Sequence, residues 1–145
     1  MARKWGGTVT CVDSFCGNIN GGTSVDRPDM IGDTAAAMVR LGVSAQIRLI
    51  PALTVDAAQF WREPIDFLYV DADHSYASVR DDLAAWWPRL RIGGLIAGDD
   101  YRSSLYPGLE RAWDEFEVEH GQAFERVETP NTNPPGMALI YGVKR

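Results

Sequence analysis

Short apolar runs alternate with longer segments of helical periodicity, and this alternation constrains the fold more than any other feature of the sequence. The apolar runs are rich in β-branched residues and occupy residues 8–12, 46–50, 65–70 and 95–97. The helical segments occupy residues 30–41, 55–61, 75–87 and 109–120. Successive βαβ units have this order, and they build a mainly parallel sheet. We therefore predict a Rossmann-like α/β fold with a mainly parallel sheet and helices on both faces.

The C-terminal part of the sequence has a different pattern. Two further apolar runs, residues 124–127 and 137–143, are separated by the polar, proline-rich residues 129–136. Two adjacent strands joined by a loop predict an antiparallel hairpin at the edge of the sheet. A chain of 145 residues has the size of one hydrophobic core with its covering helices, so we predict a single domain over residues 1–145.

The charge and hydropathy of the chain indicate the class of its partners. The formal net charge is −6, whereas a protein that follows a nucleic-acid backbone needs clustered Lys and Arg. No stretch approaches the roughly 20 apolar residues that cross a membrane. We therefore predict a cytoplasmic protein that binds a small molecule, with neither a nucleic acid nor a membrane as its partner.

Carboxylates follow three of the four predicted strands. They are Asp13, then Asp71 and Asp73, and then Asp99 and Asp100. Open α/β sheets bind ligands at the carboxyl ends of their strands, and neighbouring acidic groups repel one another unless something compensates them. We predict that the last four converge on one cation or one substrate hydroxyl. The alternative, in which they are polar strand ends and helix caps, stays open at this stage.

Two of the polar residues allow both a functional and a structural interpretation. Asp13 can accept hydrogen bonds from ribose hydroxyls, as acidic residues do in nucleotide-binding sheets, or it can form a turn. His74 follows the second acidic pair and precedes a predicted helix that Ser75 would cap. Histidine is the side chain whose ordinary pKa lies nearest neutrality, which suits catalysis or a metal-linked role. However, His74 can also cap the helix. The sequence leaves both alternatives open.

Three segments together resemble a known family. They are residues 5–13 (WGGTVTCVD), residues 65–76 (IDFLYVDADHSY) and residues 93–101 (GGLIAGDDY). They look like successive motifs of class I S-adenosylmethionine-dependent methyltransferases, and most of all like the group with the sugar and macrolide O-methyltransferases and their cephalosporin-tailoring relatives. The resemblance implies methyl transfer from S-adenosylmethionine to a small-molecule hydroxyl with the assistance of a divalent cation.

The resemblance also implies roles for the matching residues in binding the cofactor and a cation. Asp13 matches the acidic residue that holds the cofactor ribose, and Ser14 and Asp71 complete the expected cofactor-binding set. Asp71, Asp99 and Asp100 match carboxylates that bind a divalent cation, usually magnesium, in the metal-dependent members. Many relatives carry His where Asp99 stands, so this metal set is not uniform across the group.

Asp73 or His74 matches the position of the general base in this family. A cation lowers the pKa of a coordinated hydroxyl, and a base placed beside it removes the proton before the attack on the methyl group. The resemblance therefore implies that Asp73 and His74 are the catalytic residues.

One part of the family pattern has no counterpart in the sequence. The sheet of these enzymes begins with a strand, a glycine-rich turn at the cofactor and a helix, and residues 1–5 match only the end of that helix. The glycine pairs at 6–7, 21–22 and 93–94 do not follow a strand and open a helix, as the fingerprint requires. We therefore expect an N-terminally truncated domain that binds S-adenosylmethionine weakly or not at all by itself. We also expect the two neighbours of the missing strand to pair directly, and the chain to self-associate as a homo-oligomer.

Two other functions compete with methyl transfer. A degenerate methyltransferase fold would serve binding or assembly without catalysis. A phosphatase of the DxD type is suggested by Asp71 and Asp73, but such enzymes need a lysine between their acidic motifs, and this chain has none between Lys4 and Lys144.

Overall fold

The computed structural model describes residues 6–16, 29–127 and 138–145. The chain divides into two compact units, Met1–Ala57 and Ala58–Arg145, and each is described here by itself. The single domain over the whole chain stays a prediction. The polar residues 18–28, with Gly21 and Gly22 among them, predict a long loop of the kind that lines ligand sites. These residues and residues 129–136 lie outside the described residues.

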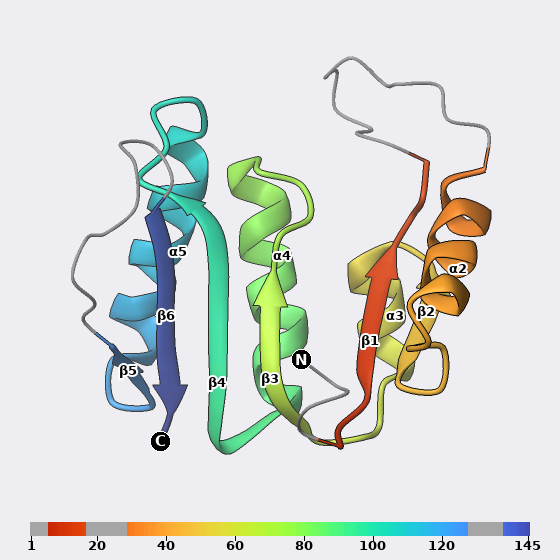
Figure 1. The fold of residues 1–145 in the computed structure, drawn as a ribbon. Helices are drawn as coiled ribbons and strands as arrows, with labels where there is room; N and C mark the ends of the chain where they lie inside the picture. Colours follow the sequence, from red (N-terminus) through yellow and green to blue (C-terminus); the bar gives the residue numbers. More distant parts are fainter. Residues whose placement is uncertain (1–5, 17–28, 128–137) are drawn as a thin grey trace. The chain divides into compact units, whose positions relative to one another are not determined.

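The first unit contains a parallel strand pair with a helical crossover. Its elements are β1 (Val9–Asp13), α2 (Met30–Arg40), β2 (Ile47–Pro51) and the first turn of α3 (Thr54–Phe60). The two strands pair in parallel from Val9 opposite Ile47 to Asp13 opposite Pro51, as Figure 1 shows. Asp29 caps α2, because its Oδ1 accepts a hydrogen bond of 2.8 Å from the N–H of Gly32. The predicted βαβ unit is thus confirmed.

The second unit contains a four-stranded mixed sheet. Its elements, after the end of α3, are β3 (Ile65–Val70), α4 (Tyr76–Trp86), η1 (Trp87–Arg89), β4 (Leu90–Tyr101), α5 (Pro107–His120), β5 (Phe124–Arg126) and β6 (Ala138–Lys144). The strand order is β3-β4-β6-β5, with β3 and β4 parallel and the other two pairs antiparallel. The predicted antiparallel hairpin strands at the sheet edge are therefore confirmed.

One expectation about the strands needs correction. β4 begins at Leu90 and not at Leu95, because its pairing with β3 continues across an irregularity that includes Gly93, whose φ is +75°. Within the described part of the first unit, the hydrogen-bonded neighbour of β1 is β2, and within that of the second unit the neighbour of β3 is β4. Direct pairing of the two strands that flank the missing one would join the two units, so it stays a prediction, as does self-association.

The core of the second unit lies between the sheet and two helices. α4 and α5 cover the same side of the sheet in Figure 1. Their apolar faces pack on the alternate strand residues that point toward them, with Trp113 1% exposed at the centre. The core includes Val79, Leu83, Leu109, Trp113, Phe116, Ile96 and Ile140. Trp86, Trp87 and Trp113 are all buried, so their rings contribute to packing in the core.

Gly98 permits the closest approach between β4 and α5. A Cβ atom at this position would overlap the indole ring of Trp113. We expect Gly98→Ala to lower the free energy of unfolding by about 1–3 kcal/mol, the usual cost of overpacking a core. Urea titration would measure this loss. Gly7→Ala is the control, because nothing lies within 4 Å of its added Cβ, and an equal loss in both variants would contradict the explanation.

Candidate active site

Three carboxylates gather where β3 and β4 end. The two strands are parallel, and Val70 at the end of β3 lies opposite Gly98 in β4. Asp71 follows the first of these residues, and Asp99 and Asp100 follow the second, so all three carboxylates lie along one edge of the sheet. We call Asp71, Asp99 and Asp100 the acidic rim. Of the four carboxylates that we predicted to converge, the second unit thus brings Asp71, Asp99 and Asp100 together. Their convergence with Asp73 on one cation or one hydroxyl stays a prediction.

The acidic rim makes ionisation of Asp71 unfavourable. Burial raises the pKa of this carboxyl, and the charges of Asp99 and Asp100 raise it further, whereas His74 acts in the opposite direction and does not compensate them. A folded protein seldom keeps such an electrostatic cost without a use for it, and perturbed groups of this kind cluster at functional sites.

Tyr69 extends the acidic rim by a protonated hydroxyl. Partial burial, a hydrogen bond to Asp99 and the nearby carboxylates together raise the pKa of Tyr69 to about 12. The hydroxyl therefore keeps its proton at neutral pH and donates to Asp99. This residue was not among those predicted from the sequence, although its position two residues before Asp71 places both side chains on the same face of β3.

His74 lies between two carboxylates of the acidic rim. Its Nε2 atom is 3.5 Å from Oδ1 of Asp71 and 3.5 Å from Oδ2 of Asp100. Both contacts are longer than the roughly 2.7–3.2 Å of a well-formed N–H···O hydrogen bond. Nε2 is also buried without a well-formed partner among the described residues. The imidazole ring stacks on the ring of Tyr106, with 4.4 Å between the centroids and 22° between the planes.

The backbone at the end of β4 has an uncommon conformation. Asp100 has φ +56° and Arg102 has φ +64°, in the left-handed region that non-glycine residues rarely adopt. The turn is held by the N–H of Asp100, which donates to Oδ1 of Asp99 at 2.9 Å, and by the N–H of Ser103, which donates to the Asp100 carbonyl at 3.0 Å. Strain of this kind persists only where the surroundings impose it, and it is common at functional sites.

Asp73 contributes to the start of α4. Its Oδ1 accepts a hydrogen bond of 2.8 Å from the N–H of Ser75, and the Ser75 hydroxyl accepts one of 3.3 Å from the N–H of Ser78. The prediction that Ser75 caps this helix is confirmed. Asp73 therefore accepts a backbone hydrogen bond at the start of the helix, as the helix-cap alternative predicted. Its role as a base stays a prediction.

Asp13 and Ser14 lie at the end of β1 in the first unit. Oδ1 of Asp13 accepts a hydrogen bond of 2.7 Å from the N–H of Phe15, and the Ser14 hydroxyl accepts one of 3.3 Å from the N–H of Cys16. These contacts form a tight turn, in which Phe15 has φ +54°. Asp13 is exposed, so its carboxylate can still accept hydrogen bonds from a ribose.

The arrangement does not form a ready-made cation site. Carboxylate oxygens suit magnesium, but within residues 6–16, 29–127 and 138–145 no three acidic, His or Cys side chains are placed to hold a metal ion together. The imidazole of His74 stands between Asp71 and Asp100 instead. Magnesium at Asp71, Asp99 and Asp100 therefore stays a prediction.

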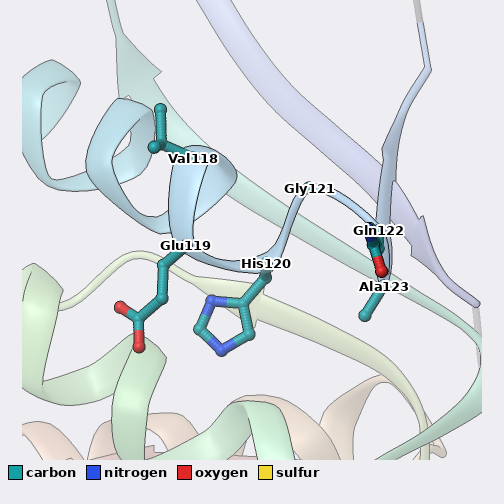
Figure 2. A pocket seen from close by; sticks show the side chains of 6 residues that line it. All are labelled: Val118, Glu119, His120, Gly121, Gln122 and Ala123. Atoms are coloured by element: carbon teal, nitrogen blue, oxygen red, sulfur yellow. The ribbon is translucent and has the colours of Figure 1, made fainter.

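Two other features of the structure lie outside the acidic rim. An open pocket is lined by residues 118–123 at the C-terminal end of α5, as Figure 2 shows. It lies at the other end of the helix from Tyr106, and its histidine, His120, is accounted for by stacking on Phe116 at 4.5 Å. None of the described helices has the length and apolar character needed to cross a bilayer.

Neutralising Asp71 should stabilise the protein. Because its pKa is raised in the folded state, ionisation of Asp71 costs folding free energy at pH values above its ordinary range. We expect Asp71→Asn to melt at a higher temperature than the wild type at pH 7, and this gain to vanish at acidic pH, where both side chains are neutral. Thermal unfolding at a series of pH values would measure the difference. A lower melting temperature at pH 7 would contradict the electrostatic explanation.

Comparisons with known proteins identify the family. A family model described as a methyltransferase domain matches residues 1–101. Among solved structures, an O-methyltransferase from Bacillus cereus in complex with SAH is 17% identical, with a TM-score of 0.64 over 96% of this chain and 64% of that one. An rRNA methylase from Streptococcus thermophilus is 18% identical, with a TM-score of 0.63 over 94% and 87%. The TDP-rhamnose 3'-O-methyltransferase CalS11 of calicheamicin biosynthesis is 19% identical, with a TM-score of 0.57 over 94% and 58%. No curated protein matches.

Proposed function

Because the chain belongs to the class I S-adenosylmethionine-dependent methyltransferases, we propose that it transfers a methyl group from S-adenosylmethionine to a hydroxyl of a small molecule. The observation that carries the proposal is the acidic rim, in which three carboxylates and His74 meet at the carboxyl ends of two parallel strands. Ligands of open α/β sheets bind at this edge.

The charge of the acidic rim suits this cofactor. The sulfonium centre of S-adenosylmethionine supplies a cationic, electrophilic methyl group. Asp71, Asp99 and Asp100 create a negative potential at the strand ends, and such a potential attracts a cation. Asp71 also fits a direct contact with the cofactor, while Asp13 and Ser14 at the end of β1 fit the ribose hydroxyls.

Asp73 is the residue that we assign as the proton acceptor. His74 directs its Nε2 atom at two carboxylates of the rim, which leaves it poorly placed to receive a proton from an acceptor molecule at that atom. Asp73 follows the same strand and uses Oδ1 to accept from Ser75, so its carboxylate is held in a fixed orientation. In the proposed step, Asp73 takes the proton of the acceptor hydroxyl, and the oxygen forms a bond to the methyl carbon as the bond from that carbon to sulfur breaks.

A small molecule is a better acceptor than RNA for this chain. The net charge of −6 and the acidic rim would repel a phosphate backbone, although two of the similar structures are described as rRNA methylases. CalS11, another similar structure, acts on a TDP-linked sugar. A hydroxyl of a sugar is therefore the acceptor that we propose.

A transfer assay tests this function. The purified protein would be incubated with S-adenosylmethionine and one acceptor in each reaction. The acceptors are TDP-rhamnose, a catechol and ribosomal RNA, and each reaction is run with and without added magnesium. Mass spectrometry would detect the methylated acceptor and S-adenosylhomocysteine. Because we expect the domain to bind this cofactor weakly, S-adenosylmethionine would be present at millimolar concentration, and under this condition we expect methylation in a small-molecule arm. Methylation of RNA alone, or no transfer in any arm, would contradict the proposal.

A further inference from the structure

We propose that Tyr106 is a positioning residue, which holds the imidazole of His74 between Asp71 and Asp100. The inference rests on the proposed function, because it concerns the same acidic rim. Tyr106 is far from His74 in the sequence, and the residues that surround it there do not indicate a role in the site.

The ring of Tyr106 supports one face of the imidazole. The centroids of the two rings are 4.4 Å apart and their planes are 22° apart, which is a stacked pair. The edge of the imidazole that carries Nε2 faces the two carboxylates at 3.5 Å. At that distance the carboxylates form no well-directed hydrogen bond that would orient the imidazole. The stacked ring of Tyr106 therefore fixes the plane of the imidazole.

Tyr106 is itself held by the backbone. Its N–H donates to the carbonyl of Ser103 at 3.1 Å, and its carbonyl accepts from the N–H of Leu109 at 3.0 Å, in the first turn of α5. Pro107 follows it and restricts its backbone further. The position of the tyrosine ring is therefore fixed by the start of a helix.

The same loop also places one of the carboxylates. Ser103 is 5% exposed, and its N–H donates to the carbonyl of Asp100 at 3.0 Å. Backbone hydrogen bonds thus link Asp100 to Ser103 and Ser103 to Tyr106. The Tyr106 ring stacks on His74, whose Nε2 atom lies beside the Asp100 carboxylate. One rigid loop sets both the carboxylate and the ring that orients its partner.

The chain offers a direct spectroscopic test, because it has only two histidines, His74 and His120. Protein labelled with 15N in its histidine rings would be compared as the wild type, Tyr106→Phe and Tyr106→Leu, with His74→Gln used to assign the signals. His120 stacks on Phe116 and serves as the internal control for a folded second unit.

We expect the Leu variant to shift the ring signals of His74, through loss of the ring current and of the fixed orientation, while those of His120 stay in place. Tyr106→Phe should give His74 signals close to those of the wild type, because phenylalanine keeps the stacked aromatic ring. In the transfer assay the Leu variant should lose about two- to tenfold in kcat, the range that an aromatic pair supplies, and the Phe variant should not.

Unchanged His74 signals in the Leu variant would overturn the proposal, as would equal displacement of His74 in the Phe and Leu variants. The spectra do not depend on methyl transfer. A protein whose His74 signals respond as expected but which methylates no acceptor would therefore refute the proposed function and leave the role of Tyr106 in orienting His74 intact.

Discussion

The Asp73→Asn variant is expected to transfer methyl groups about 10²- to 10⁴-fold more slowly than the wild type, the usual contribution of a general base. Asparagine has nearly the same shape and retains an oxygen that can accept the hydrogen bond from the N–H of Ser75, so the start of α4 should be preserved. The amide cannot take up a proton at neutral pH. The loss should therefore appear in kcat, measured with a saturating acceptor from the transfer assay.

Asp81→Asn is the matched control for this experiment. Asp81 lies in α4, is exposed, and pairs with Arg80 at 2.7 Å on the helix surface. The same chemical change at this position should leave kcat unaltered. Wild-type transfer by the Asp73 variant would contradict the assignment of the base, and a comparable loss in both variants would show that the effect is not specific to the site.

Trp113→Ala should cost about 3–5 kcal/mol of unfolding free energy, the usual range for a large buried aromatic side chain. The indole is 1% exposed and forms an edge-to-face pair with Phe116 at 5.9 Å. It also fills the space that Gly98 leaves open above β4. Its removal would leave a cavity between the sheet and α5, which urea titration would report as a lower midpoint.

Val118→Ala is the matched control in the same helix. Val118 is 85% exposed, so its truncation should change the free energy of unfolding by less than about 0.5 kcal/mol, the usual range for surface positions. A loss below about 1 kcal/mol in the Trp113 variant would contradict the central place of this ring in the core.

The regular elements could be predicted because local patterns determine them. The apolar run at residues 65–70 forms β3 with the predicted bounds, and Ser75 caps the following helix as expected. β4 could not be predicted in full. Its first residues, from Leu90, extend the strand through two glycines because they pair with β3. The sequence pattern around these residues contains no information about that pairing partner.

The acidic residues of the candidate site could be found for a similar reason. Parallel strands bring their carboxyl ends together, so Asp71 and Asp100 are neighbours once their strands are recognised. Tyr106 could not be found in this way. Its contact with His74 depends on how the loop after β4 folds back, through the hydrogen bond between Ser103 and Asp100, and no sequence periodicity records that turn.

The acidic rim also explains why stability and function would conflict at Asp71. Burial and two neighbouring carboxylates raise its pKa, so the folded protein is less stable for keeping it ionised. Removal of a destabilising polar group from an active site commonly raises stability at the expense of activity. We therefore expect the stabilised Asp71→Asn variant to transfer methyl groups more slowly than the wild type.

The proposed function requires the cofactor to bind at the acidic rim. The most direct measurement is a titration of the protein, labelled with 15N in its two histidine rings, with S-adenosylhomocysteine to millimolar concentration, which also detects weak binding. We predict progressive shifts of the His74 signals, while those of His120 at the far end of α5 stay unchanged. His74 signals that do not move, or that move no more than those of His120, would contradict the claim.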